Sequence, residues 1–344
     1  MKSISINSAI GNSKILIGEN LVNVSEYLPE NKKVVIITDE KINAVYGHQF
    51  PKADLIITIP QGESNKSLKT LEYIFDKMAD AEIDRSSFVL GIGGGIVCDV
   101  AGFAAAIYMR GISFGFVSTT LLSQVDASVG GKNGVNFGGY KNLVGTFCLP
   151  EFVICDPEML KTLPQNELIS GMAEVVKHGL IADANLFEFI EQNTDKIRKY
   201  DLNVLTRFVH DSVIIKSNIV NEDVKEKGVR RILNFGHTIG HAIEKNTGMQ
   251  HGMAISIGMV MAAKISVARE LISKSDADRI ISLLEKIGLP VTLPVDPTIL
   301  LDAIKRDKKR DRDEIHFVLL TKIGKAFSEN ISISELKLLL NDLR

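Results

Sequence analysis

Three of the seven histidines lie close together in the second half of the chain. His237 and His241 are four residues apart, so on a helix both would project from one face, and His251 follows shortly afterwards. A lone histidine is more often an ordinary core or surface residue. Clustering beside small residues, which let helices approach closely, instead favours a metal site, because imidazole is a common metal ligand.

A catalytic zinc site usually takes three protein ligands and leaves one position open. If two of the histidines are ligands, one more must be found. Glu174 is the best candidate, because the segment Met172-Ala-Glu-Val-Val-Lys-His178 places its carboxylate in an otherwise apolar helix, where unpaired burial is costly. The alternative is an ordinary salt bridge to Lys177 or His178, and spacing alone does not decide between the two.

A second chemical feature is the glycine turn Gly93-Gly94-Gly95, which follows the apolar run 88–92 and precedes a helix predicted to begin near Val97. Glycines at the end of a strand let the backbone approach a pyrophosphate, and the next helix offers free N–H groups to its charge. Asp99 could then bind a ribose or orient the loop. The sequence therefore predicts a dinucleotide site, with a purely structural tight turn as the alternative.

Other polar residues follow the predicted strands at their carboxyl ends, where ligands bind in open α/β sheets. Asp39 closes the first strand, Glu63 and Lys66 follow the second, and Thr119 and Thr120 close the fourth. We expect these residues to contact the cofactor. Simple turn chemistry would explain any one of them.

The segment 123–142 is rich in glycine and interleaved with lysines and amides. Glycines permit close backbone approach, and cationic and amide groups donate hydrogen bonds to phosphate or carboxylate oxygens. The segment is therefore predicted to be a loop that wraps an anion. The candidate donors there and in separate segments are Lys132, Lys141, Asn142, Lys177, Lys216, Arg230 and Lys308, although each alone could be a solvated surface charge.

The elements that would position these residues differ between the two halves of the chain. Continuous apolar runs at 34–38, 55–59, 88–92 and 113–117 predict strands buried on both faces. Helical spacing at 68–78 and 100–107 separates them, which predicts a doubly wound parallel sheet, and residues 1–21 alternate like a hairpin.

From about Pro164 onward the periodicity is almost wholly helical, and only 315–320 looks like a strand. We therefore predict an α/β protein with an N-terminal nucleotide-binding domain at 1–155 and a mainly α-helical, metal-binding domain at 156–344. The helices are predicted at 165–181, 185–192, 201–221, 234–247, 252–272, 276–287 and 297–306.

Composition excludes several classes of function. Lys plus Arg number 40 against 42 Asp plus Glu, which leaves no electrostatic footprint for nucleic acid or an anionic membrane. Three cysteines without CxxC spacing favour reduced thiols and a cytoplasmic location. The most apolar long window, 253–263, is too short to span a bilayer and is predicted to be a buried helix.

These segments resemble the 3-dehydroquinate synthase family from about residue 35 to 325. The blocks GGGIVCD, MRG, LLSQVDASVGGKNGVN, GGYKNLVG and GMAEVVKHGLI are similar to that family's central sequence blocks. The order of residues from Lys216 to His251 also resembles the family, and IKRDKK is similar to its last substrate-contacting lysine, at Lys308 or Lys309.

The resemblance implies a carbon–oxygen lyase of the shikimate pathway, which makes aromatic amino acids, with NAD and Zn²⁺ or Co²⁺ as cofactors. Its metal ligands would be Glu174, His237 and His251. Its substrate would be 3-deoxy-D-arabino-heptulosonate 7-phosphate, converted to 3-dehydroquinate and phosphate by transient oxidation, elimination, reduction and aldol closure. A homodimer is also implied, with Arg110 reaching from a partner subunit.

The resemblance also assigns roles to single residues. His241 would shuttle a proton, while Asp126 and Glu226 orient cationic groups; Lys132 and Asn234 complete the catalytic set. The substrate contacts would be Arg110, Asp126, Lys132, Asn142, Lys177, Lys216, Arg230, Asn234, His241 and Lys308. The cofactor contacts would be Asp39, Glu63, Lys66, Gly93, Gly94, Gly95, Asp99, Thr119, Thr120, Lys141, Thr162 and Glu167.

Three positions depart from the family pattern, where Cys98 replaces a common glycine, Ala127 a serine and Asn133 a threonine. The alternatives are a cyclase for another sugar phosphate, a metal-dependent polyol or glycerol-phosphate dehydrogenase, and a catalytically silent binding module. The sequence does not decide the native metal, or whether the enzyme or the leaving phosphate is the base of the elimination.

Overall fold

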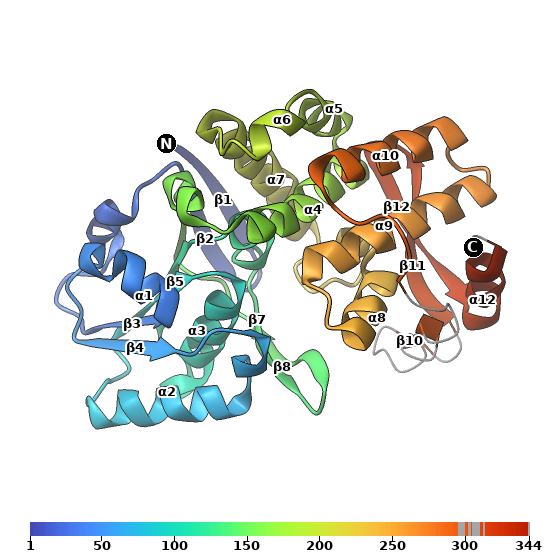
Figure 1. The fold of residues 1–344 in the computed structure, drawn as a ribbon. Coiled ribbons are helices and arrows are strands. Elements are labelled where there is room, and N and C mark those ends of the chain that lie inside the picture. Colours follow the sequence, from blue (N-terminus) through green and yellow to red (C-terminus); the bar gives the residue numbers. More distant parts are fainter. Residues whose placement is uncertain (295–299, 302–303, 305–309, 312–313, 343–344) are drawn as a thin grey trace. The chain divides into compact units, whose positions relative to one another are not determined.

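The computed structural model describes residues 1–294, 300–301, 304, 310–311 and 314–342 (Figure 1). The chain forms two compact units: Met1–Leu163 with Leu205–Val224, and Pro164–Val204 with Lys225–Arg344. The first unit thus extends beyond the boundary predicted after Cys155. It also includes the segment 205–224, which was predicted to belong to the second domain. Contacts such as that of Lys216 with Asp126 tie this segment to the first unit.

The first unit is built on a seven-stranded sheet in the order β1-β2-β9-β6-β5-β3-β4. All neighbours are parallel except β1 and β2, which form the predicted N-terminal hairpin. The doubly wound sheet and its four predicted strands are confirmed, although β4 lies at the edge of the sheet and is only partly buried, and β9 is an additional strand. The strands are β1 (Lys2–Ser8), β2 (Gly11–Ile17), β3 (Val34–Asp39), β4 (Leu55–Ile59), β5 (Phe88–Gly93), β6 (Ser113–Ser118) and β9 (Phe152–Cys155).

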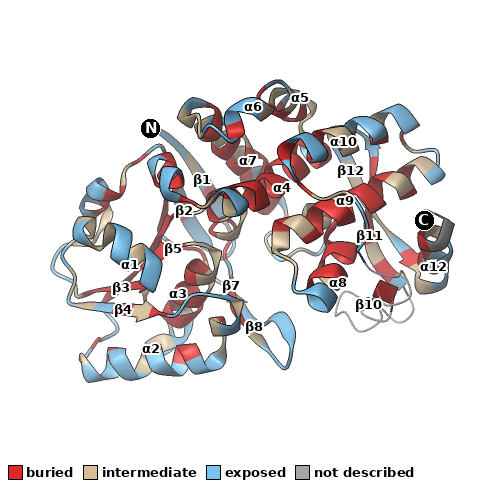
Figure 2. Cartoon of the chain, viewed as in Figure 1, coloured by how far each residue is buried: buried red, intermediate tan, exposed pale blue. Residues whose placement is uncertain are grey.

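Every residue of β5 is buried, because the strand lies inside the sheet and carries a continuous apolar run (Figure 2). Helix α3 begins directly after it at Gly95, two residues earlier than predicted. The helices of this unit are α1 (Glu40–Tyr46), α2 (Leu68–Asp80), α3 (Gly95–Ile107) and most of α7 (Leu202–Glu222). Short helical turns are η1 (Leu21–Tyr27), η2 (Gly47–Gln49), η3 (Glu63–Asn65), η4 (Tyr108–Arg110), η5 (Ser123–Ala127) and η6 (Pro157–Thr162).

The segment predicted as an anion-wrapping loop is more regular than expected. It begins with the π-helical turn η5 and continues as an antiparallel pair, β7 (Lys132–Phe137) and β8 (Tyr140–Phe147). Gly138 and Gly139 connect the strands with φ of 59° and 78°. Two consecutive left-handed residues are what a two-residue hairpin turn requires, so these glycines form the turn between β7 and β8.

The second unit combines helices with a small antiparallel sheet of order β10-β11-β12. The helices are α4 (Gln165–Ala182), α5 (Ala184–Gln192), α6 (Thr194–Ile197), η7 (Val229–Asn234), α8 (His237–Thr247), α9 (His251–Ala268), α10 (Lys274–Ile287) and α12 (Ile333–Asp342). The strands are β10 (Arg310–Asp311), β11 (Glu314–Lys322) and β12 (Lys325–Ser332).

The helical character of this unit is confirmed, with corrections at several ends. The helix predicted at 234–247 starts at His237, because Gly236 has a left-handed φ of 78° that interrupts a helix. The helix predicted at 252–272 ends at Ala268. Strand β12 and helix α12 were not predicted, and the predicted helix 297–306 lies mostly outside the described residues.

Helix α9 is long and apolar enough to cross a membrane by length and composition alone. However, 72% of that window is buried inside the protein, and α4, α8, α10 and β11 all pack against the helix (Figure 2). This is the pattern of a core helix, and it agrees with the buried helix predicted for 253–263. The packing of α9 in the core of the second unit therefore holds the residues at both of its ends in place.

Candidate functional site

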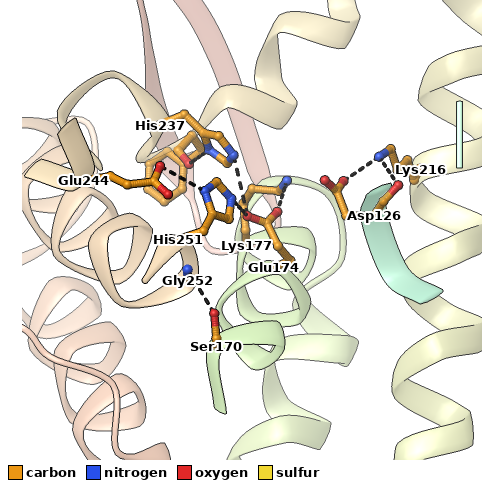
Figure 3. Close-up of polar contacts among 10 residues, drawn as sticks. Asp126, Ser170, Glu174, Lys177, Lys216, His237, Glu244, His251 and Gly252 are labelled. Carbon is orange, nitrogen blue, oxygen red and sulfur yellow. Dashed lines mark hydrogen bonds and ion pairs between the residues drawn. The ribbon is translucent and has the colours of Figure 1, made fainter. Parts of the chain in front are cut away.

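Glu174, His237 and His251 come together in the second unit (Figure 3). Glu174 lies in the middle of α4, His237 is the first residue of α8, and His251 is the first of α9. Glu174 Oε1 lies 3.5 Å from His237 Nε2 and 3.4 Å from His251 Nε2. Two imidazole nitrogens and one carboxylate oxygen form the kind of donor set that zinc takes in catalytic sites.

Close helix packing at glycines makes this convergence possible. An added Cβ on Gly258 of α9 would lie 1.9 Å from the carbonyl oxygen of Gly236, and one on Gly252 would lie 2.0 Å from that of Ser170. The Gly252 N–H also donates to Ser170 Oγ at 3.1 Å. The absence of side chains at these glycines therefore lets α9 approach both α4 and the start of α8.

The Glu174 carboxylate is fully buried and has two different surroundings. Its Oε2 accepts a hydrogen bond from the buried ammonium of Lys177, which is the salt bridge considered as the alternative. Its Oε1 is buried, has no hydrogen-bond partner among the residues that the structure describes, and faces the two histidines. Buried polar atoms are rarely left unsatisfied, so the arrangement fits a metal ion at Oε1. The salt bridge and the donor set therefore occur together.

The charges around this carboxylate shift the pKa of the neighbouring groups. Burial alone would raise the pKa of Glu174, but Lys177 and the two histidines hold it well below its usual value. Burial opposes protonation of His251, but the adjacent carboxylates of Glu174 and Glu244 raise its pKa to about 9. The pocket thus stabilises positive charge next to Glu174.

His241 lies one turn beyond His237 on α8 and is half-buried. Its ring centroid is 5.2 Å from that of His237 and 5.9 Å from that of His251. His241, Glu244 and His251 form a second set of donors that shares one histidine with the first. Glu244 was not predicted from the sequence, although it falls on the same helical face as His237 and His241.

The other predicted substrate residues of the second unit lie in or near the short helix η7. Arg230 is buried, and the Asn234 amide donates a hydrogen bond to the Glu226 carboxylate. This contact places the Glu226 carboxylate against an amide, and the expectation that Glu226 orients cationic groups stays a prediction. Lys308 and Lys309 lie outside the described residues.

In the first unit the glycine turn closes tightly on its neighbours. An added Cβ on Gly93 would lie 2.5 Å from the Val97 side chain, and one on Gly94 would lie 3.0 Å from Thr120 Cγ2. Gly94 is the N-cap of α3 and provides no side-chain hydrogen bond to it. The start of α3 thus keeps the bare backbone that binds a pyrophosphate, so the turn fits a dinucleotide.

Cys98, which departs from the family pattern, lies within helix α3 and is buried. Its thiol points back to the Gly93 carbonyl oxygen at 3.8 Å, and burial raises the pKa of that thiol to about 12. The substitution is therefore accommodated by a regular helix and requires no unusual backbone at the turn.

Several predicted cofactor contacts form one network beside this turn. The buried Lys66 ammonium pairs with Asp99 and also donates to Asn142 Oδ1, at 2.5 Å. Lys141 lies 3.7 Å from Glu63. Burial raises the pKa of Asp99 although Lys66 opposes the shift. Residues from three separate segments are thus brought together, and their contact with the cofactor stays a prediction.

The remaining predicted residues of the first unit lie at separate positions and do not form one network. Asp39 caps α1 by accepting the Ile42 N–H at 3.0 Å, so it takes part in turn chemistry. The Thr119 N–H bonds the Gly93 carbonyl at 3.0 Å, which places it at the glycine turn. Thr162 is exposed and shares a 2.7 Å hydrogen bond with Tyr46.

Asp126 and Lys216 form a contact between η5 and α7. The Lys216 ammonium donates to Asp126 Oδ1 at 2.5 Å and to its carbonyl oxygen at 2.6 Å (Figure 3).

Lys132 begins β7 and is exposed, as is Arg110, whose φ of 67° is left-handed. Glu167 lies in the first turn of α4, in the second unit.

Comparison with known proteins identifies the family. The N-terminal 3-dehydroquinate synthase family model matches residues 56–170, and the C-terminal one matches residues 171–310. The chain belongs to the 3-dehydroquinate synthase family. A curated 3-dehydroquinate synthase of Ruminiclostridium cellulolyticum is 44% identical over 317 residues, which cover 89% of this chain and 88% of that protein.

Two solved structures of related cyclases share the fold of this 3-dehydroquinate synthase family member. A 2-deoxy-scyllo-inosose synthase, complexed with carbaglucose-6-phosphate, NAD⁺ and Co²⁺, is 30% identical with a TM-score of 0.88, covering 99% of this chain and 100% of that one. The 2-epi-5-epi-valiolone synthase of Streptomyces hygroscopicus, with NAD⁺ and Zn²⁺ bound, is 25% identical with a TM-score of 0.89, covering 100% and 98%.

Proposed function

We propose that this protein is a 3-dehydroquinate synthase that converts 3-deoxy-D-arabino-heptulosonate 7-phosphate to 3-dehydroquinate and phosphate. The observation that carries the proposal is the similarity over most of the chain to curated enzymes of that name. The convergence of Glu174, His237 and His251 supports it, because a family member that had lost catalysis would have no need to retain this donor set.

NAD and a divalent metal ion, zinc or cobalt, are the proposed cofactors. NAD fits the bare N-terminus of α3 after Gly93-Gly94-Gly95, together with Lys66 and Asp99, and the metal ion fits Glu174, His237 and His251. When bound, NAD accepts and returns a hydride, and the metal ion lowers the pKa of the substrate hydroxyl that is oxidised. The related cyclase structures that contain NAD⁺ with Co²⁺ or Zn²⁺ support this assignment.

The remaining predicted residues would hold the substrate. Cationic side chains bind carboxylate and phosphate oxygens, and Lys177, Arg230 and Lys216 supply buried positive charge. Lys177 is already held by Glu174 and Lys216 by Asp126, so each ammonium is fixed before substrate arrives. Lys132, Asn142, Asn234, His241 and Lys308 are proposed phosphate contacts, with Arg110 contributed from a partner subunit.

The proposed reaction divides the work between oxidation and proton transfer. Once the substrate hydroxyl has become a ketone, the neighbouring C–H is acidic, so phosphate can leave by elimination. His241 is proposed to accept and release protons, since an imidazole changes charge near neutral pH. After the ketone is reduced again, the ring opens and an aldol closure forms the carbocycle. The proposed reaction involves no net oxidation or reduction, so the proposed enzyme class is a phosphate-eliminating carbon–oxygen lyase.

We further propose that the enzyme acts in the cytoplasm as a homodimer in the shikimate pathway. Cys98, Cys148 and Cys155 are free thiols, which suits a reducing compartment. The dimer is what the family resemblance implies, and it gives Arg110 its proposed role.

The test is phosphate release from 3-deoxy-D-arabino-heptulosonate 7-phosphate with catalytic NAD and zinc, with the absorbance of NADH recorded in parallel. Many turnovers of phosphate without net NADH are expected, and His237→Ala should abolish them. Stoichiometric NADH without phosphate would instead indicate a dehydrogenase. Release from a hexose 6-phosphate but not from the heptulosonate would indicate a cyclase for another substrate, as the likeness to 2-deoxy-scyllo-inosose synthase allows.

A further inference from the structure

The two histidines of the donor set are each contacted on both ring nitrogens. Their Nε2 atoms face Glu174 Oε1. On the opposite side of each ring, Nδ1 faces an acceptor: the Phe235 carbonyl oxygen lies 3.1 Å from His237 Nδ1, and Glu244 Oε2 lies 3.5 Å from His251 Nδ1. Glu244 thus stands beyond His251 as seen from Glu174 (Figure 3).

The carboxylate of Glu244 lies in an unusual position. It lies on α8 with its side chain 8% exposed, so placing an ionised group there is costly without a partner. A neutral imidazole carries one N–H, and an acceptor beside Nδ1 keeps that proton there and leaves the lone pair on Nε2. Once a metal ion is bound at Glu174 Oε1, the Glu244 carboxylate therefore favours the His251 tautomer whose Nε2 lone pair faces that ion.

We propose that Glu244 is a positioning residue for the metal site, which accepts the Nδ1–H of His251 and so fixes the ring with Nε2 toward the metal ion. The inference rests on the metal site of the proposed function. A carboxylate behind a histidine ligand also makes the ligand more basic, and removal of such partners typically lowers metal affinity about 10- to 100-fold. His237 is held by a neutral carbonyl, so the two ligands are supported unequally.

A competing role for Glu244 is direct ligation, because His241, Glu244 and His251 could also hold an ion. The two roles use His251 differently. In the positioning role its Nδ1 stays protonated and its Nε2 binds the metal, whereas direct ligation with Glu244 would engage Nδ1. The position of the proton on His251 therefore separates them.

The experiment compares Glu244→Ala, Glu244→Gln and His237→Ala in the purified full-length protein. Zinc affinity is measured by competition with a chromophoric chelator, and the His251 tautomer is read from ¹⁵N NMR shifts of the zinc-loaded protein. We expect Glu244→Ala to bind zinc about 10- to 100-fold more weakly. Glu244→Gln should recover part of the affinity, since its amide oxygen still accepts the Nδ1–H.

Glu19→Gln is the matched control, because Glu19 is also 8% exposed and hydrogen-bonded, but to Tyr27 in the first unit. It should leave zinc affinity unchanged whatever it does to stability. Wild-type zinc affinity in Glu244→Ala would overturn the inference, as would an Nδ1-bound metal or a Glu244→Gln variant as defective as His237→Ala. If His237→Ala also bound zinc normally, the proposed metal site itself would be wrong.

Discussion

The close approach of α9 to the start of α8 can be tested with Gly258→Ala. The added Cβ would lie 1.9 Å from the Gly236 carbonyl oxygen, whereas such contacts essentially never fall below 3.0 Å. The helices must therefore separate by about 1 Å, because close-packed interiors offer no spare volume. The next residue after Gly236 is His237, so the displacement acts directly on the donor set.

Two opposing terms decide the effect on stability. Alanine is a better helix former than glycine by up to about 1 kcal/mol, but overpacking of this kind costs about 1–3 kcal/mol. We expect the free energy of unfolding of the metal-free protein to fall by about 1–2 kcal/mol. Ligand distances at zinc tolerate only about 0.2 Å, so zinc affinity should fall by about tenfold or more.

Urea unfolding of the metal-free protein and chelator competition for zinc measure the two effects separately. Gly248→Ala is the control, since Gly248 caps the C-terminus of α8 with a left-handed φ of 70°, and no neighbouring atom of the described residues lies within 4 Å of a Cβ added there. Its strain should cost about 1–2 kcal/mol without weakening zinc binding. The reasoning would be refuted if Gly258→Ala bound zinc like the wild type, or if both variants lost zinc equally.

Three further predictions concern charge and the cofactor site. The pKa of His251 is raised from 6.5 to about 9 in the metal-free protein, so its stabilising contribution is complete below pH 6.5 and is lost as the pH rises through 9. Zinc must displace that proton, and its apparent affinity should rise about tenfold per pH unit up to about pH 9; a flat profile by calorimetry would contradict this. Lys177→Met leaves Glu174 buried without its cation, so the free energy of unfolding of the metal-free protein, measured in urea, should fall by about 3–5 kcal/mol. Saturating zinc should restore much of that stability. An equal loss with zinc bound would count against the metal site. Lys66→Met removes the partner of Asp99 and should weaken NADH binding by about tenfold, or about 1.4 kcal/mol. Binding is followed by the fluorescence of NADH itself, because the chain has no tryptophan. Unchanged binding would show that Lys66 does not belong to the cofactor site.

The sequence predicted the first unit well because its strands are nearly continuous apolar runs. The strand β12 was not predicted for the opposite reason. Ser328, Glu329 and Asn330 make it polar, and among the described strands it pairs with β11 alone, at the edge of its sheet. The hairpin β7–β8 was taken for a loop because its glycines and polar residues suit either structure. In both cases pairing with the adjacent strand of a hairpin, which the residue pattern of one strand does not record, decided the outcome.

The candidate metal site was partly visible in the sequence. Histidine spacing placed His237 and His241 on one helical face, but it did not show that His237 and His251 would face Glu174. The spacing also could not distinguish a salt bridge from a metal ligand at Glu174, whereas the structure gives each carboxylate oxygen a different neighbour. Glu244 was overlooked because its burial and its contact with His251 depend on how α8 packs against α9.

The order of the two units along the chain has a consequence for synthesis. The polypeptide leaves the first unit after Leu163, returns to it at Leu205 and leaves again after Val224. On the ribosome, the nucleotide-binding unit therefore cannot be completed until residue 224 has emerged. By then the segment Pro164–Val204, which belongs to the second unit, has already been synthesised. Lys216 must find Asp126 across 90 residues of chain, and such distant pairing slows folding. For the same reason, no single cut divides the gene into two pieces that each encode a whole unit.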